Sequence, residues 1–201
     1  MIAIIDYGMG NLRSVQKAFQ KVGARAFITQ KPSDLKKAEK IVLPGVGAMK
    51  PAMKKLRSLG FVGAIKESIE SGKPFLGICL GLQLLFEESN EGGSVKGLGI
   101  LPGKVVRFSR LKVPHMGWNQ IEIKQSHSPI FSGIKNKADV YFCHSYFAKP
   151  KEKNVAAALT DYGVNFVSSV AKGNIFGVQF HPEKSQDIGL RILRNFKALP
   201  S

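Results

Sequence analysis

The sequence predicts an α/β fold, with a mostly parallel sheet flanked by helices and an antiparallel extension. In the first half of the chain, short apolar runs alternate with segments of helical periodicity, which is typical of parallel strands joined by crossover helices. In the second half, apolar runs follow one another with few helical patterns between them, which indicates hairpins. The length of 201 residues and the ordinary apolar share of 44% predict a single domain over residues 1–201.

The elements of the first half follow in order. A first strand is expected at residues 2–5, and then a helix that is capped by Asn11 and ends at Gly23. The glycines in this turn suggest a dinucleotide-binding motif, but Arg13 stands where the third glycine of that motif would fall, so we reject this interpretation. The other expected elements are strands at residues 24–29, 41–43 and 75–78, a short helix from Ser33 and a helix at residues 62–69.

Strands dominate the second half. Residues 120–124 alternate apolar and polar side chains, and residues 171–174 have the composition of a hairpin turn. A final helix is expected from the spacing of Ile188, Ile192 and Phe196. The strands expected here are residues 105–108, 120–124, 140–147, 166–170 and 175–180.

The formal charge of +16 is compatible with a nucleic-acid partner, an acidic protein partner or a generally basic proteome. The basic residues occur in small groups along the chain without interleaved aromatic residues, so we favour a solvated surface and expect no nucleic acid. No apolar run approaches the roughly 18 residues of a membrane span, and the N-terminus lacks the features of a signal peptide. We therefore expect no membrane contact and a cytoplasmic location, where Cys79 and Cys143 remain free thiols.

Cys79 is the first candidate catalytic residue. It lies between Gly77 and Gly81, after an apolar run and before a helical pattern, as in the nucleophile elbow of hydrolases. At such a corner the thiol faces the positive end of a helix, which favours the thiolate, and the N–H of Leu80 points toward the carbonyl under attack. A small buried cysteine at a strand end would explain the stretch equally well, so its partners must decide.

His181 and Glu183 are candidate partners at the exit of the expected strand 175–180. Two residues apart in an extended segment, their side chains share one face, and Pro182 fixes the backbone between them. A carboxylate so placed can hold one imidazole nitrogen and leave the other free to act on a thiol. The other histidines have no carboxylate two residues on; they are His115, His127 and His144.

Two further stretches stand out. Residues 44–47 place two glycines at the end of an expected strand, where the backbone bends sharply, approaches a ligand closely or simply turns. Residues 114–119 form an expected loop with few charges and hold the single tryptophan, Trp118, which is either a core residue or an interface anchor. No Cys, His, Asp and Glu cluster has the spacing of metal ligands, so we expect no metal and no cofactor.

These motifs resemble those of the class I (triad) glutamine amidotransferases. Residues 77–83, 44–47 and 179–185 look like the nucleophile, oxyanion and base motifs of that family, whose fold is flavodoxin-like. More narrowly, residues 83–87, 114–119 and 141–146 resemble the glutaminase subunits of imidazole glycerol phosphate synthase, from histidine biosynthesis. The resemblance spans nearly the whole chain. One departure is Leu82, where the family usually carries Met, a volume-conserving change.

The resemblance implies that glutamine is hydrolysed through a thioester. Cys79 would attack the side-chain amide, His181 would protonate the departing ammonia and then activate water, and Glu183 would orient the imidazole. The implied oxyanion residues are Leu80, Val46 and Gly47, and the implied glutamine contacts are Gln83, Glu91, Ser145 and Tyr146.

The resemblance also implies a partner, because the chain has no room for a second active site that could accept the ammonia. That partner is the synthase (cyclase) subunit of imidazole glycerol phosphate synthase, in a heterodimer; the expected interface residues are Pro114, Trp118, Asn119 and Lys184. One alternative is the glutaminase subunit of another amidotransferase, for anthranilate or aminodeoxychorismate synthesis. A second alternative, of another class, is a basic binding module without turnover, which salt-dependent binding of nucleic acid would reveal.

Overall fold

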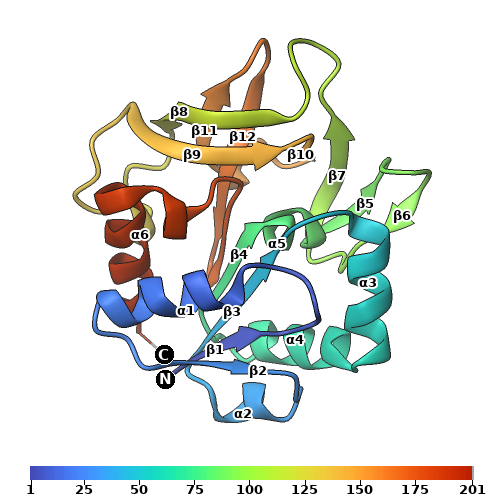
Figure 1. The fold of residues 1–201 in the computed structure, drawn as a ribbon, viewed down its shortest axis with the longest axis vertical. Coiled ribbons are helices and arrows are strands. Elements are labelled where there is room, and N and C mark those ends of the chain that lie inside the picture. The colour runs from blue at the N-terminus through green and yellow to red at the C-terminus, as the bar shows by residue number, and fades with distance from the viewer. Residues whose placement is uncertain (201) are drawn as a thin grey trace.

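The computed structural model describes residues 1–200 and confirms the α/β class, with a parallel half and an antiparallel extension of one sheet (Figure 1). All neighbouring strands in the parallel half run the same way. In spatial order they are β2 (Ala26–Thr29), β1 (Ile2–Ile5), β3 (Lys40–Gly45), β4 (Phe75–Cys79) and β13 (Ile175–Val178).

The antiparallel extension starts at β13, which pairs with β12 (Asn165–Lys172) through the expected turn at residues 171–174. From β12 the sheet continues through β10 (Tyr146–Pro150), β7 (Leu101–Arg107), β5 (Phe86–Ser89) and β6 (Val95–Lys96). A branch leaves β12 through β11 (Ala156–Asp161), β8 (His115–Ile123) and β9 (Ala138–His144). Within this part, β5 and β7 are parallel.

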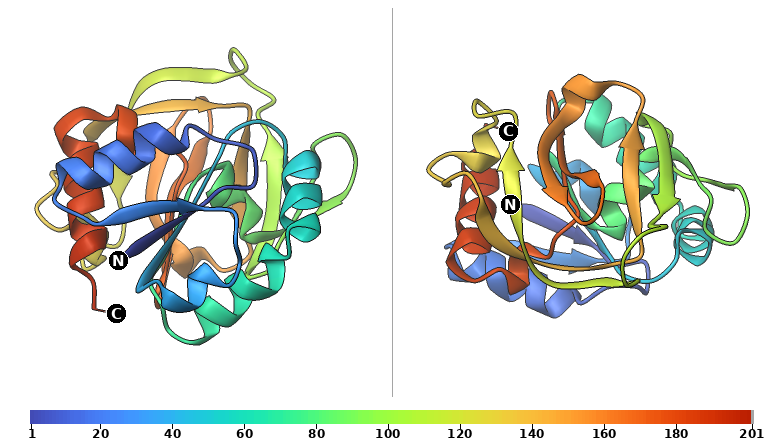
Figure 2. Two further views of the ribbon diagram at one scale, coloured as in Figure 1. Left: turned by 60° about the horizontal axis from the view of Figure 1, so that its bottom comes forward. Right: turned by 90° about the horizontal axis from the view of Figure 1, so that it is seen from above.

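Helices cover both faces of the parallel half, as Figures 1 and 2 show. On one face, α1 (Leu12–Lys21) packs against α6 (Gln186–Ala198), with the Phe19 and Phe196 ring centroids 6.2 Å apart. Asn11 caps α1 as predicted, since its Oδ1 accepts a hydrogen bond from Ser14 N. The other face carries α2 (Asp34–Lys37), α3 (Met49–Ser58) and α4 (Phe61–Glu70).

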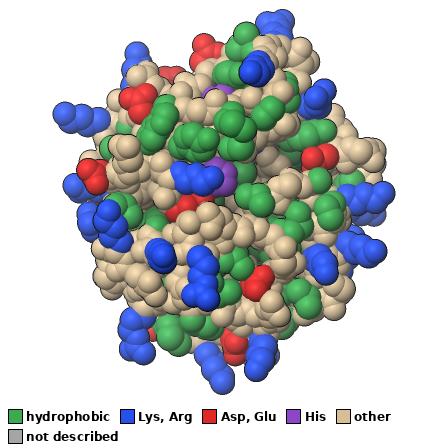
Figure 3. Space-filling model, in the orientation of Figure 1, with side chains coloured by type: hydrophobic (Ala, Val, Ile, Leu, Met, Phe, Trp, Pro, Cys, Tyr) green, Lys and Arg blue, Asp and Glu red, His purple; other side chains and the backbone are tan. Residues whose placement is uncertain are grey.

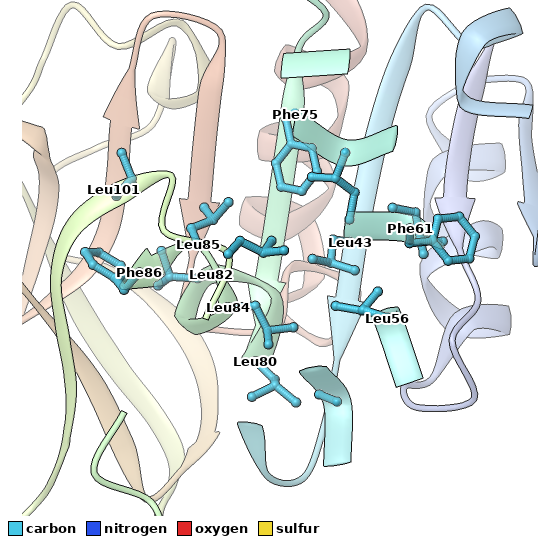
Figure 4. Packing of buried hydrophobic residues seen from close by; sticks show 14 of the residues in the cluster. Leu43, Leu56, Phe61, Phe75, Leu80, Leu82, Leu84, Leu85, Phe86 and Leu101 are labelled. Carbon is cyan, nitrogen blue, oxygen red and sulfur yellow. The ribbon is translucent and has the colours of Figure 1, made fainter. Parts of the chain in front are cut away.

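The core beneath α3 and α4 is continuous with the short helix α5 (Leu80–Leu84), which follows β4. Leu43 from β3, Leu56 from α3 and Phe61 from α4 are fully buried there (Figure 4). Truncating a side chain such as Leu56 to alanine should cost about 2–5 kcal/mol. This packing fixes the β3 and β4 ends that carry the predicted oxyanion and nucleophile motifs.

Several expected boundaries were wrong. Helix α3 was not expected from the sequence, although residues 49, 52, 53 and 56 have helical spacing and form its buried face. Strands β5, β6 and β11 were not expected either. Residues 115–119 are not a loop but the start of β8, where His115 is buried and Trp118 exposed on the same strand. The expected strand 140–147 breaks at Ser145 into β9 and β10.

Three observations bear on the expected partners and ligands. On the face shown in Figure 3, lysine and arginine side chains are spread around the surface and do not gather into one patch. No helix within residues 1–200 has the length and apolar character needed to cross a bilayer. In the same residues, no group of three His, Cys, Asp or Glu side chains is disposed to hold a metal ion.

Candidate active site

Cys79 lies at the carboxyl end of β4, in the tight strand-to-helix corner that the sequence predicts. Its φ is 54° and its ψ is −108°, a conformation that is strained for a residue with a side chain. The corner is closed by backbone contact, because a Cβ on Gly81 would lie 1.7 Å from the Leu43 carbonyl oxygen. Gly77 is also confined, since a Cβ on it would lie 2.6 Å from the Gly81 carbonyl oxygen. The glycines therefore make the elbow possible.

The helix after the corner differs from the expectation in length. Helix α5 ends at Leu84, and Phe86 already belongs to β5. The N–H groups of its first turn remain without intrahelical acceptors, so Leu80 N–H is available as a donor beside Cys79. A helix of five residues has a small macrodipole, however, so it contributes less to a thiolate than a long helix would.

His181 and Glu183 form the predicted contact, with His181 Nδ1 2.8 Å from Glu183 Oε1. The predicted backbone was wrong, because Glu183 lies in the 3-10 turn η3 (Pro182–Lys184) rather than in an extended segment. Burial lowers the pKa of His181, but its interactions with Cys79 and then with Glu183 outweigh burial and raise the pKa to about 10. His181 therefore favours the imidazolium form at neutral pH.

Contacts from two other elements fix this turn. His181 N donates to the Tyr141 carbonyl of β9 at 2.9 Å, and Ser185 Oγ donates to the His181 carbonyl at 2.7 Å. Helix α6 approaches so closely that a Cβ on Gly189 would lie 1.9 Å from the Pro182 oxygen. The imidazole is therefore placed by the middle of β9, the end of β13 and the start of α6 together.

A cavity of about 440 Å³ opens beside Cys79 and His181. This volume is within the range of small-molecule sites. The predicted oxyanion and glutamine-contact residues all line it: Val46, Gly47, Leu80, Gln83, Glu91, Ser145 and Tyr146. Gly47 has a φ of 87°, a left-handed conformation that suits glycine. The break between β9 and β10 at Ser145 lies at the same cavity.

Two of the lining side chains are held by hydrogen bonds. Gln83 Nε2 donates to the Tyr146 carbonyl at 2.8 Å, and Glu91 Oε2 accepts from Met49 N at the start of α3, also at 2.8 Å. These contacts leave two side-chain oxygens unused, Gln83 Oε1 and the other carboxylate oxygen of Glu91, Oε1. The unused oxygens can receive the ammonium group of an amino acid.

The two other buried histidines, His115 and His144, have their ring nitrogens engaged in contacts away from Cys79. His144 lines the cavity, but its Nε2 lies 3.0 Å from His115 Nδ1 and its Nδ1 lies 2.8 Å from the Tyr146 carbonyl. Burial lowers the pKa of His144 to about 3 and that of His115 to about 4. Both are therefore neutral near pH 7 and hold the segment at Ser145 in place.

The expected interface residues fall into two groups. Pro114 and Lys184 line the cavity, and Trp118 is 48% exposed, with its ring 6.0 Å from that of Tyr141. Lys184 Nζ lies 5.7 Å from the centre of the same tyrosine ring. Asn119 points the other way, because its Nδ2 donates to the Asp161 carbonyl at 2.9 Å. The structure thus gives Asn119 an internal contact, and its interface role stays a prediction.

Sequence reasoning missed one polar residue at the centre of the site. Gln179 is fully buried, and its Nε2 lies 3.6 Å from Cys79 Sγ. The residue stands inside the motif 179–185, so a signal was present: a long polar side chain two residues before His181, at the end of an apolar strand. Cys79 itself is a free thiol, as is Cys143, in agreement with the expectation.

Comparison with known proteins agrees with this geometry. The family model for class I glutamine amidotransferases matches residues 3–198. One crystal structure of a glutamine amidotransferase superposes with a TM-score of 0.78 at 19% identity, covering 99% of this chain and 100% of that chain. PurLQS from Thermotoga maritima superposes with a TM-score of 0.75 at 20% identity, over 97% and 96% of the chains. The chain belongs to the class I glutamine amidotransferases and has their fold.

More similar sequences narrow the assignment. The chain is 56% identical to the imidazole glycerol phosphate synthase subunit HisH of Syntrophotalea carbinolica, over 98% of each chain. It is 55% identical to the HisH subunit of Geobacter metallireducens, over 97% of this chain and 96% of the relative. The chain belongs to the family of HisH subunits of imidazole glycerol phosphate synthase.

Proposed function

We propose that the chain hydrolyses glutamine to glutamate and ammonia, with Cys79 as nucleophile, His181 as acid and base, and Glu183 as the group that orients His181. The observation that carries this assignment is the 2.8 Å contact of the buried His181 and Glu183 at the cavity that Cys79 also lines. Membership of the glutamine amidotransferase family supports it.

In the proposed reaction, Cys79 acts as a thiolate and His181 as an imidazolium. The Cys79 thiolate attacks the side-chain amide carbon of glutamine, and the resulting oxyanion accepts hydrogen bonds from backbone N–H groups. The His181 imidazolium gives its proton to the departing ammonia and leaves a thioester. The neutral imidazole then takes a proton from water, whose hydroxide attacks the thioester and releases glutamate and the thiolate.

The lining of the cavity suggests how the substrate is held. We assign Leu80 N–H as one oxyanion donor and the peptide at Val46 or Gly47 as the second, since both stretches line the cavity beside Cys79. Gln83 and Glu91 are assigned to the ammonium end of glutamine through their unused oxygens, and the segment Ser145 and Tyr146 to its carboxylate end. No step of this scheme uses a cofactor.

The ammonia must reach an acceptor before water protonates it. Relatives with more than half of their residues identical are named as subunits of imidazole glycerol phosphate synthase, so we propose that the synthase (cyclase) subunit of that enzyme docks over the cavity. Trp118 and Lys184, on the exposed side of Tyr141, would contact it. A cytoplasmic location of this heterodimer stays a prediction.

A partner exchange tests the proposal. The chain is mixed in turn with the synthase subunits for imidazole glycerol phosphate, anthranilate and aminodeoxychorismate, and glutamate release is measured with each acceptor substrate present. We expect release to be stimulated by the imidazole glycerol phosphate synthase subunit alone. Stimulation by one of the other two would assign the chain to that enzyme, and no glutamate release with any of them would contradict the proposed function.

A further inference from the structure

The Cys79 thiolate needs a source of stabilisation besides helix α5. That helix has five residues, and the effect of a helix terminus on a charge depends on the aligned peptide dipoles behind it. His181 supplies a positive charge on one side of the sulfur. The Gln179 side chain supplies an amide donor, since its Nε2 lies 3.6 Å from Cys79 Sγ.

The neighbours of Gln179 fix the orientation of its amide. Gln83 Nε2 lies 2.9 Å from Gln179 Oε1 and can only donate, so this atom of Gln179 must be the accepting oxygen. The NH₂ group is thereby directed at Cys79. The Gln179 backbone is anchored as well, because its N donates to the Ser168 carbonyl at 2.9 Å. With the side chain fully buried, no water competes for this amide.

We propose that Gln179 is a further residue of the catalytic site, which donates a hydrogen bond to the Cys79 thiolate and couples it to the glutamine contact Gln83. This inference rests on the proposed function. Hydrogen bonds to an ionised acceptor are about twice as strong as neutral ones, so the donor favours the thiolate before attack. It acts again when the thioester is hydrolysed, because the sulfur then leaves with the electron pair of the broken C–S bond and regains its negative charge.

The alternative is that Gln179 only fills the core and holds Gln83. The two roles differ in one property, the pH at which Cys79 becomes reactive. A residue that only holds Gln83 changes the KM for glutamine and leaves this pH unchanged. A donor to the sulfur changes it, whether or not glutamine is present.

The test uses the variant Gln179→Met, which keeps the length of the side chain and removes the donor. The rate of Cys79 alkylation by iodoacetamide is followed from pH 5 to 10 by peptide mass spectrometry, which separates Cys79 from Cys143. A hydrogen bond to a charged group is worth about 1 to 2 pH units. The pH at which the alkylation rate of Cys79 is half-maximal, its midpoint, should therefore be higher by about that amount in Gln179→Met than in the native chain. Ser169→Ala is the control, since it removes a buried hydrogen bond to the Gly177 carbonyl away from the cavity, and its midpoint should equal the native one.

A second variant, Gln179→Glu, covers the case in which the methionine variant does not fold. It keeps the oxygen that accepts from Gln83 and replaces the donor by an oxygen, so the midpoint should rise at least as far. Native midpoints in the folded variants would overturn the inference. Glutamate release by the native chain with its synthase subunit is measured in parallel: its absence contradicts the proposed function, whereas normal release with unchanged midpoints contradicts only the role of Gln179.

Discussion

His181 Nδ1 and Glu183 Oε1 lie 2.8 Å apart because the chain turns back on itself directly after the histidine. Their side chains are only 5% and 2% exposed. Water therefore cannot compete for the carboxylate, and the imidazole has one preferred orientation. Its other nitrogen, Nε2, is left available to exchange a proton with Cys79.

This contact predicts unequal effects of two substitutions. His181→Ala removes the acid and base and should reduce the kcat of glutamine hydrolysis by about 10⁵-fold or more, whereas Glu183→Gln keeps the base and should cost roughly tenfold to a hundredfold less. Steady-state glutamate release with the synthase subunit present measures both. An undiminished rate in His181→Ala would show that another residue is the base.

The same contact predicts a pH dependence of stability. The pKa of His181 is about 10 in the folded chain against an ordinary 6.5. Because the folded pKa is the higher one, the stabilisation is complete below about pH 6.5 and is lost as the pH rises through 10. Urea unfolding measures the free energy of unfolding between pH 7 and 10. Over this range it should fall less in Glu183→Gln than in the native chain, since Glu183 is one cause of the raised pKa. Parallel curves would contradict this.

Replacement by alanine should have opposite effects on stability at Gly81, in the elbow, and at Gly63, in helix α4. Gly81→Ala places a Cβ 1.7 Å from the Leu43 carbonyl and should destabilise the chain by about 3 kcal/mol or more. The control is Gly63→Ala in α4, where nothing lies within 4 Å of the added Cβ; it should stabilise the chain by about 0.5–1 kcal/mol. Thermal unfolding measures both, and a Gly81→Ala variant as stable as the native chain would contradict the packing of the elbow.

Docking is predicted to depend on Trp118. Trp118→Ala should raise the Kd for the synthase subunit by about tenfold to a hundredfold, because exposed tryptophans that are buried on binding often dominate an interface. Leu59→Ala is the matched control, since Leu59 is also exposed but follows the end of α3 that is remote from the cavity. Titration calorimetry gives both values. Equal effects of the two variants, or none, would move the interface elsewhere.

Much of the parallel half could be predicted because its signals are local. The strand at residues 2–5, the cap at Asn11 and the corner at Cys79 each depend on a few neighbouring residues. The contact of His181 with Glu183 was predicted from a spacing of two residues, and it survives the wrong backbone because a short turn also brings such residues together.

The remaining features depend on contacts that are distant in the sequence. Residues 114–119 were expected to form a loop, yet β9 pairs with the segment from His115 to Ile121. The role of Gln179 could not be predicted because it depends on contacts with Cys79 and Gln83, which lie about a hundred residues earlier in the chain. Pairing and burial of this kind are decided by the tertiary structure.

The central claim is that ammonia is produced at Cys79 and consumed on another chain. The most direct measurement is product formation by the complex of the Cys79→Ala chain with its synthase subunit, once with glutamine and once with ammonium salt at alkaline pH. We expect loss of the glutamine-dependent reaction and an ammonia-dependent rate equal to that of the native complex. Glutamine-dependent synthesis that persists in Cys79→Ala would contradict it.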